Sequence, residues 1–312
     1  MSAAALGHSQ IANLGSPCGR KIVLADVAGF CFGVRRAISM TERAQEAGLG
    51  SITTLGPIVH NSQVIERLRA RGIGGAQNLA EIEKGTVVLS AHGSAPIVIR
   101  EAHERGLDIL DVTCPFVTKV HRAAKNLLNQ GYDVILVGDP GHTEVKGVFG
   151  AVEEIGGTIR LVSSPEEVAS MPLGNKVGVV CQTTQRSETF ARVVAEVCLR
   201  ATDVRAINTV CSATEELQTA AIKLAKSVDV VLVIGGARSA NTRRLREICE
   251  RTGTPAYQVE TAKDIDMAWL EGHNVVGLTA GASTPDWLIE EVAMAVNGGE
   301  LPEGWNLHHP DE

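Results

Sequence analysis

The sequence predicts an α/β fold with mostly parallel sheets, and three observations support this class. Short apolar runs alternate with longer amphipathic runs over residues 21–297, a pattern typical of strands joined by crossover helices. The 32 glycines and the 3% share of aromatic residues indicate many turns around an aliphatic core. A chain of 312 residues exceeds one ordinary compact unit, so two or three α/β modules are expected.

Each expected strand is a short apolar run, and most are followed by a helix with apolar residues spaced by about 3.6 positions. The strands are expected at 21–26, 51–55, 86–90, 107–112, 133–138, 158–162, 176–181, 204–210, 229–234, 255–259 and 274–279. The helices are expected at 33–47, 62–71, 96–105, 117–130, 144–155, 187–200, 213–227, 241–252 and 284–296. Pro115 also suits a first helical position, where a backbone N–H would have no partner.

The strand count between three cysteines predicts three modules of similar build. They are expected at 21–113, 114–206 and 207–297, which contain Cys31, Cys114 and Cys211 respectively. No clear internal repeat supports this division. Residues 1–20 are rich in Ala, Gly and Ser and are expected to form a mobile extension, while 298–312 resemble a polar tail.

Charge and cysteine content narrow the class of protein. A net charge of −7 provides no basic face for a phosphate backbone, so a nucleic-acid partner is not expected. No stretch is long enough to span a membrane, and the first 20 residues lack the pattern of a signal peptide. The seven unclustered cysteines do not suggest a disulfide framework and favour a reducing, cytoplasmic setting.

Cys31, Cys114 and Cys211 each follow an apolar strand-like run and precede a helix. A thiol at a helix N-terminus lies beside unpaired N–H groups, which lower its pKa and favour the metal-binding thiolate. Three separated thiolates without a C-x-x-C pair differ from a structural zinc site. A catalytic zinc with an open position and an iron–sulfur cluster with one open iron both remain possible.

The other four cysteines are expected to have no catalytic role. Cys181 lies within an apolar run, Cys198 and Cys249 lie within expected helices, and Cys18 lies in the N-terminal extension.

Polar side chains gather after the expected strands, where ligands of parallel sheets bind. They are His60, Asn61, His92, Ser94, His142, Glu144, Gln182, Thr183, Thr184, Ser239, Asn241 and Ser283. Each hydroxyl or amide could simply cap a helix. Together, histidines, hydroxyls and amides near glycines suit an anion such as a diphosphate. The sequence lacks a P-loop and a dinucleotide fingerprint, so a simple phosphate ester is favoured over a nucleotide.

The segments that carry these residues resemble the 4-hydroxy-3-methylbut-2-enyl diphosphate reductase family, also called LytB. They are 29–38 (GFCFGVRRAI), 59–61 (VHN), 90–93 (SAHG), 111–121 (DVTCPFVTKVH), 141–145 (GHTEV), 182–184 (QTT) and 279–283 (TAGAS). The resemblance implies a trefoil of three α/β domains around a central 4Fe–4S cluster. Cys31, Cys114 and Cys211 match its three ligands and leave one iron open.

The resemblance also implies roles for the other residues. The diphosphate-binding positions match His60, His92, His142, Ser239, Asn241 and Ser283. Thr183 and Thr184 match threonines beside the substrate hydroxyl, and Glu144 matches the residue that delivers the proton. The implied reaction reduces an allylic alcohol diphosphate to isopentenyl or dimethylallyl diphosphate with two electrons from a donor such as reduced ferredoxin or flavodoxin.

Three departures from the family pattern keep alternatives open. Ala240 stands where a second serine is usual, Thr143 where a proline is usual, and 215–218 (EELQ) replaces a run such as Asn-Arg-Gln. Two other hypotheses are a non-redox hydro-lyase that uses the open iron as a Lewis acid, and a non-catalytic cluster-bearing paralogue that binds diphosphates.

Overall fold

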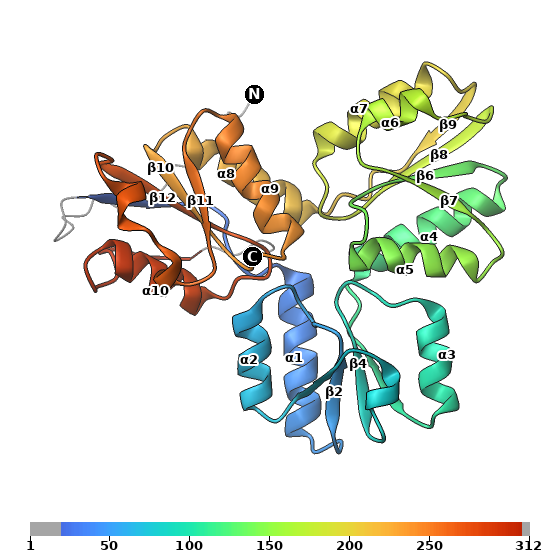
Figure 1. Ribbon diagram of the computed structural model, residues 1–312, viewed down its shortest axis with the longest axis horizontal. Helices are drawn as coiled ribbons and strands as arrows, with labels where there is room; N and C mark the ends of the chain where they lie inside the picture. Colours follow the sequence, from blue (N-terminus) through green and yellow to red (C-terminus); the bar gives the residue numbers. More distant parts are fainter. Residues whose placement is uncertain (1–19, 308–312) are drawn as a thin grey trace, which may run out of the picture. The chain divides into compact units, whose positions relative to one another are not determined.

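Residues 20–307 are described by the computed structural model, and they form three separate four-stranded sheets in which every pairing is parallel. The predicted α/β class with parallel sheets is therefore confirmed. Strands from the same stretch of sequence form two of the sheets, whereas the third combines both ends of the described chain (Figure 1).

The sheet that combines both ends has the order β1-β12-β10-β11. Its strands are β1 (Lys21–Leu24), β10 (Val230–Ile234), β11 (Ala256–Val259) and β12 (Val275–Ala280). Helices α8 (Ser212–Ala225) and α9 (Ala240–Arg251) cover one face, and α10 (Asp286–Val296) covers the other. Residues 21–24 therefore share a sheet with strands more than 200 residues away in the chain.

The second sheet has the order β3-β2-β4-β5. Its strands are β2 (Ile52–Leu55), β3 (Gly74–Ala76), β4 (Thr86–Leu89) and β5 (Asp108–Asp111). Its helices are α1 (Phe32–Glu46), α2 (Ser62–Ala70) and α3 (Pro96–Glu104), with the short helix η1 (Leu79–Glu81). In Figure 1, α1 and α2 lie on one side of this sheet and α3 lies on the other.

The third sheet has the order β7-β6-β8-β9. Its strands are β6 (Asp133–Val137), β7 (Ile159–Val162), β8 (Lys176–Cys181) and β9 (Asp203–Ala206). Helices α4 (Pro115–Asn129) and α5 (Thr143–Glu153) pack on one face, and α6 (Pro165–Ser170) and α7 (Ser187–Cys198) pack on the other. Because strand residues alternate between faces, neighbours such as Leu136 and Val137 enter different clusters.

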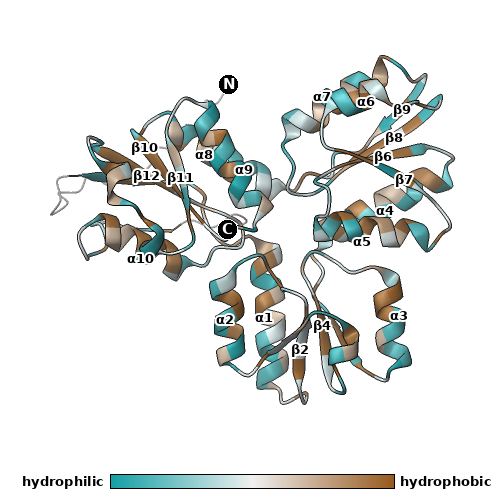
Figure 2. Cartoon of the chain, in the orientation of Figure 1, coloured by the Kyte–Doolittle hydropathy of each residue, from teal (hydrophilic) through white to brown (hydrophobic). Residues whose placement is uncertain are grey.

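The hydropathy of the chain follows these layers. In Figure 2 the strands are mostly brown, while the helices show brown on one side and teal on the other. All five residues of β10 are buried, as expected for a central parallel strand covered on both faces.

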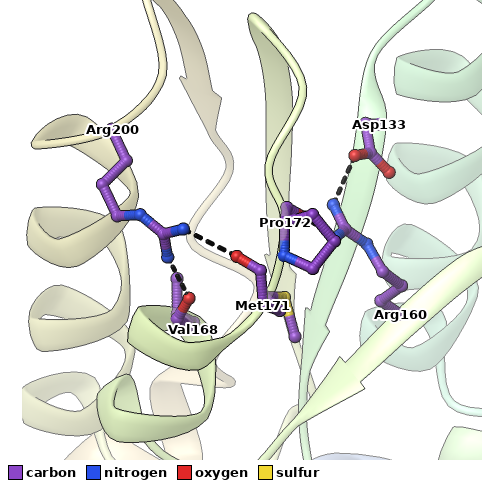
Figure 3. A network of polar contacts seen from close by, with 6 residues as sticks. All are labelled: Asp133, Arg160, Val168, Met171, Pro172 and Arg200. Carbon is purple, nitrogen blue, oxygen red and sulfur yellow. Dashed lines mark hydrogen bonds and ion pairs between the residues drawn. The ribbon is translucent and has the colours of Figure 1, made fainter.

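Two arginines hold the connection around α6 in the third sheet (Figure 3). Arg200 donates hydrogen bonds to the carbonyls of Val168 and Met171, the latter at 2.7 Å. Arg160 donates to the carbonyl of Pro172 and to the carboxylate of Asp133. The bonds to Met171 and Pro172 reach carbonyls just past the end of α6, and the bond to Val168 adds a second donor to a carbonyl that already accepts the N–H of Met171.

Several expected elements differ from the structure. The expected strand 204–210 ends at Ala206, because the hydroxyl of Thr209 both accepts from the N–H of Cys181 and donates to its carbonyl, in place of a backbone ladder. β3 and α6 were not expected, and neither were η1 and two further short helices, η2 (Ala262–Asp264) and η3 (Met267–Leu270).

The described chain divides into two compact units. One ends at Cys31 and resumes at Glu216, and the other comprises Phe32–Glu215. The expected modules 21–113, 114–206 and 207–297 stay a prediction, although β1 pairs with β12 rather than with a strand of the first module. The expected extension 1–20 lies outside the described residues except for Arg20, as do the last five residues of the expected tail. Within residues 20–307, no helix is both long and apolar enough to cross a membrane.

Candidate functional site

All three candidate cysteine ligands lie at helix starts. Cys114 is the N-cap of α4, with φ −63° and ψ 133°, and Cys31 and Cys211 directly precede α1 and α8. The predicted helix starts are therefore confirmed. Two of the preceding strands end farther from their cysteines than expected, because β1 ends at Leu24, before Cys31, and β9 ends at Ala206, before Cys211.

Cys114 occupies a cradle that a glycine keeps open. A Cβ atom on Gly33, in the first turn of α1, would lie 2.5 Å from Cys114 Sγ. Any larger residue at position 33 would displace the thiol. Burial raises the pKa of Cys114 above its usual value, and the N–H groups of Phe116 and Val117 only partly oppose this. The expectation of a lowered thiol pKa is therefore wrong for Cys114 in the metal-free protein.

Backbone bonds hold the other two candidate ligands. The N–H of Cys211 donates to the carbonyl of Thr183 at 3.0 Å, and the N–H of Cys31 donates to the carbonyl of Ala282 at 3.1 Å. Cys31 belongs to one compact unit, and Cys114 and Cys211 belong to the other. Over residues 20–307, no three His, Cys, Asp or Glu side chains are grouped so that they could hold a metal ion. The three-cysteine ligand set stays a prediction.

Three histidines from three different loops form one cluster. The ring centroids of His60 and His92 are 4.1 Å apart, and His142 lies 5.6 Å from His60 and 6.0 Å from His92. His60 and His92 follow β2 and β4 of the second sheet, while His142 follows β6 of the third. The structure thus brings together side chains that the sequence only indicated separately.

His92, in this cluster, is neutral and able to accept a proton. Burial, followed by the nearby His60 and His142, lowers the pKa of His92 well below its usual value. His92 Nδ1 is buried without a hydrogen-bond partner. An unpaired buried nitrogen is costly unless a ligand satisfies it. Three imidazoles facing one another therefore suit an anion that would stabilise their protonated forms.

A fourth histidine lies close to this cluster and was not singled out from the sequence. The ring of His121, on α4, packs against the backbone at Gly93 and Gly147. A Cβ atom added to Gly147 would lie 3.3 Å from His121 Nε2, and one added to Gly93 would lie 3.3 Å from His121 Cε1. Gly93 follows His92, and Gly147 lies on α5. Burial lowers the pKa of His121 to about 4, so this ring is an uncharged spacer between the two segments.

Glu144 forms a buried pair with Thr183. Its carboxylate accepts the N–H of Thr183 on Oε1 and the hydroxyl of Thr183 on Oε2, both at 2.7 Å. Glu144 is 2% exposed and lies in the first turn of α5, two residues after His142, which caps this helix. A carboxyl group that can bind or release a proton therefore lies next to both a hydroxyl and the histidine cluster.

Thr184 belongs to a different network from Thr183. Gln182 Nε2 donates to Thr184 Oγ1 at 2.7 Å, and Gln182 Oε1 accepts the N–H of Asp139 at 2.8 Å. Asp139 also accepts from Gln185 Nε2 at 3.2 Å. Asp139 and Gln185 were not predicted from the sequence, because neither lies in a segment that resembles the family.

Ser239, Asn241 and Ser283 lie in the other compact unit, on the loops after β10 and β12. These strands are neighbours, and the loop N–H of Gly281 donates to the carbonyl of Ile234 at 2.9 Å. Both amide atoms of Asn241 and the hydroxyl of Ser283 are buried without a partner. Ser239 is the N-cap of α9 and accepts the N–H of Thr242 at 3.2 Å, so the capping alternative holds for Ser239.

The three departures from the family pattern have ordinary structural settings. Ala240 is buried as the first residue of α9, and Thr143 is the first residue of α5. Glu215 accepts a hydrogen bond from Ser187 at the start of α7.

The remaining described cysteines lie in apolar cores or at the surface, and their expected lack of a catalytic role stays a prediction. Cys181 is buried in the core of the third sheet, Cys249 lies in the core between α8, α9 and their sheet, and Cys198 is exposed. Burial, with Glu250 nearby, raises the pKa of Cys249 to about 12. Cys18 lies outside the described residues.

Comparisons with known proteins agree on one family. A family model described as "LytB protein" matches residues 22–297. A protein from Geotalea daltonii described as 4-hydroxy-3-methylbut-2-enyl diphosphate reductase is 45% identical over 272 residues, which cover 87% of this chain and 95% of the relative.

Two solved structures are also similar. One, of (E)-4-hydroxy-3-methyl-but-2-enyl diphosphate reductase, "the Terminal Enzyme of the Non-Mevalonate Pathway", is 40% identical with a TM-score of 0.67, covering 89% of this chain and 99% of that chain. The other, the reductase from Plasmodium falciparum, is 27% identical with a TM-score of 0.85, covering 94% of this chain and 95% of that chain.

Proposed function

The chain belongs to the LytB protein family, whose model matches residues 22–297, and from this membership we propose that it is a 4-hydroxy-3-methylbut-2-enyl diphosphate reductase. It is an oxidoreductase that produces isopentenyl and dimethylallyl diphosphate as the terminal enzyme of the non-mevalonate pathway. One observation carries this function in the structure itself. Three histidines lie within 6.0 Å of one another, directly beside the buried Glu144–Thr183 pair. This arrangement suits a substrate with a diphosphate at one end and a hydroxyl to be protonated near the other.

The proposed diphosphate-binding groups are His60, His92, His142, Ser239, Asn241 and Ser283. The unpaired buried atoms of His92, Asn241 and Ser283 support this assignment, because a bound phosphate would supply their missing partners. Binding the diphosphate would orient the rest of the substrate and restrict which atom meets the reacting groups.

The family is one of iron–sulfur enzymes, and the proposed cofactor is a 4Fe–4S cluster with Cys31, Cys114 and Cys211 as ligands. The donor chemistry fits, because thiolates at helix starts are soft ligands beside unpaired N–H groups. The Gly33 cradle fits as well, because it leaves room at Cys114 Sγ. When bound, such a cluster would pass two electrons from an external donor, one at a time, and would supply a Lewis-acidic iron for loss of the hydroxyl group.

Glu144 is the proposed proton donor, and Thr183 is the proposed relay. A protonated Glu144 can donate through Oε2 to Thr183 Oγ1, 2.7 Å away, while the N–H of Thr183 still binds Oε1. The hydroxyl of Thr183 can then donate to the departing oxygen, so that it leaves as water. Burial of Glu144 and Thr183 excludes bulk water as a competing proton source.

The proposed partners are an allylic alcohol diphosphate and an external electron donor such as reduced ferredoxin or flavodoxin, in the cytoplasm. A protein donor is favoured over a nicotinamide cofactor, because the sequence has no dinucleotide-binding fingerprint.

The direct test is anaerobic purification with iron and sulfide analysis, followed by an assay of 4-hydroxy-3-methylbut-2-enyl diphosphate with reduced ferredoxin or flavodoxin. Both products are expected only when a donor is present. Turnover without a donor would indicate the hydro-lyase instead. An intact cluster that binds diphosphate without any turnover would indicate the non-catalytic paralogue.

A further inference from the structure

The amide of Gln182 has one possible orientation in this structure. The N–H of Asp139 lies 2.8 Å from the Gln182 side chain, and a backbone N–H can only donate. The atom that faces it must therefore be the amide oxygen. The amide nitrogen then faces Thr184 Oγ1 at 2.7 Å and Asp139 Oδ2 at 3.4 Å.

This orientation is fixed from several sides. Gln182 is fully buried, and a Cβ on Gly138 would lie 3.1 Å from its amide oxygen and 2.9 Å from Val145 Cγ2. A rotated amide would place its oxygen against the carboxylate of Asp139 and leave the N–H of Asp139 unpaired. The carboxylate itself is held by Gln185, which is 3% exposed and donates to Oδ1.

The orientation has a consequence for Thr184. An amide nitrogen cannot accept a hydrogen bond, so Thr184 Oγ1 accepts from Gln182 and its own hydrogen points elsewhere. Thr183, the neighbouring hydroxyl, has the opposite direction, because it donates to Glu144 at 2.7 Å. The two adjacent hydroxyls therefore differ: the oxygen of Thr184 accepts from Gln182, whereas the hydroxyl of Thr183 is bonded to the carboxylate of Glu144.

We propose that Asp139 and Gln182 are positioning residues that fix Thr184 as a hydrogen-bond donor toward the substrate hydroxyl. This inference rests on the proposed function and on the family resemblance, which implies that Thr184 lies beside that hydroxyl. A donor aimed at the departing oxygen stabilises the negative charge that develops there, whereas an acceptor at the same place would oppose it.

The test compares two replacements of Gln182 in the cluster-loaded enzyme. Gln182→Glu keeps the shape, but its ionised carboxylate would accept from both Asp139 N–H and Thr184 O–H and so reverse Thr184. Gln182→Met loses both hydrogen bonds but leaves the Thr184 hydrogen free to donate. If the donor direction of the Thr184 hydroxyl matters, Gln182→Glu should be the more damaging variant. At pH 9 its kcat should fall by about 100-fold, and that of Gln182→Met by about 10-fold. Loss of shape alone predicts the opposite order, because Glu is the closer match in shape, whereas repulsion between the new carboxylate and Asp139 predicts that adding Asp139→Asn restores kcat at pH 9.

The pH profile gives a second readout. The carboxyl introduced by Gln182→Glu would be buried and would face Asp139 from the β6–α5 loop, with Glu144 and His142 of the same segment nearby, so it would titrate above the usual carboxyl range. Once protonated, it can donate to Thr184 again. The kcat of this variant should therefore recover relative to wild type as the pH falls from 9 to 6. Adding Asp139→Asn should move this recovery to lower pH.

Controls separate this inference from the function on which it rests. Iron content, KM and the affinity for inorganic diphosphate should stay within about threefold of wild type in both variants, because the diphosphate groups are untouched. If wild type with an intact cluster does not turn over, the proposed function fails. A different result would overturn only the role given to Asp139 and Gln182. In that case wild type turns over, Gln182→Met is as damaging as Gln182→Glu, and the two pH profiles are parallel.

Discussion

Glu144 accepts two hydrogen bonds from a single residue, Thr183, through the backbone N–H and the side-chain hydroxyl. The N–H bond fixes the position of the carboxyl group, while the hydroxyl bond can carry a proton in either direction. A carboxyl group held in this way keeps its place when its charge changes, which is a useful property for a proton donor.

Replacement of Glu144 tests this role. Glu144→Gln keeps an oxygen for the N–H of Thr183 but removes the transferable proton, so substrate binding should persist while kcat falls by at least about 100-fold. Single-turnover kinetics with the reduced enzyme measure this. Glu153→Gln, on the exposed end of the same helix, is the matched control. Normal turnover in Glu144→Gln would assign the proton to another group.

The histidine cluster predicts that anion binding takes up protons. The pKa of His92 is lowered by burial and by its two neighbours, so the ring is neutral near pH 7 without ligand. A bound diphosphate would raise this pKa, and binding should therefore weaken as the pH rises from the lowered pKa of the free ring to the higher pKa of the bound one. Calorimetry of inorganic diphosphate in buffers of different ionisation enthalpy measures the uptake. His92→Asn should reduce it, and an unchanged value would exclude His92 as the acceptor.

Single residues also define what the sequence could predict about the site. His60, His92, His142 and Glu144 were identifiable because each lies in a short motif after an expected strand. Asp139 and Gln185 were not, since their importance comes from a hydrogen bond across 46 positions of sequence, and neither residue type is unusual in a loop. The raised pKa of Cys114 was also missed, because the sequence shows the helix start but not the depth of burial.

At the scale of elements, the apolar runs located most strands to within one or two residues, because buried parallel strands need such runs on both faces. The errors have local causes. β3 contains two glycines in three residues and has no apolar pattern to detect. β9 ends early because the Thr209 side chain replaces the backbone in pairing with Cys181, and such a substitution leaves the apolar pattern of 204–210 unchanged.

The connection around α6 offers a test of stability at this scale. Arg200→Met keeps the aliphatic part of the side chain but removes the donors to Val168 and Met171. Loss of these bonds to helix-end carbonyls should reduce the free energy of unfolding by about 1 kcal/mol. Urea unfolding measures the change. Arg192→Met, which breaks an exposed ion pair with Glu166, should cost less, and the reverse order would contradict the role given to Arg200.

At the scale of the whole molecule, the proposed cluster ligands come from three separate stretches of the chain. Their equivalence lies in position, since each stands at the start of a helix. The other described cysteines stand within a strand or a helix, or at a helix end.

Serine substitutions should separate the two groups of cysteines. Serine at position 31, 114 or 211 should abolish a stable cluster, whereas Cys181→Ser and Cys249→Ser should retain it, because Cys181 and Cys249 are packed in apolar cores rather than at helix starts. Iron and sulfide analysis after anaerobic reconstitution, with the visible absorption of the cluster, measures the outcome. Equal loss at position 181 would overturn the ligand assignment.

The pairing of β1 with β12 has a consequence for how the protein is made. A ribosome releases β1 and Cys31 early, but their partners, β12 and the carbonyl of Ala282, follow some 250 residues later. The second and third sheets use only residues 52–206 and can form while synthesis continues. The first proposed ligand in the chain is therefore the last to be held in place, and cluster insertion should wait until β12 and Ala282 have been synthesised.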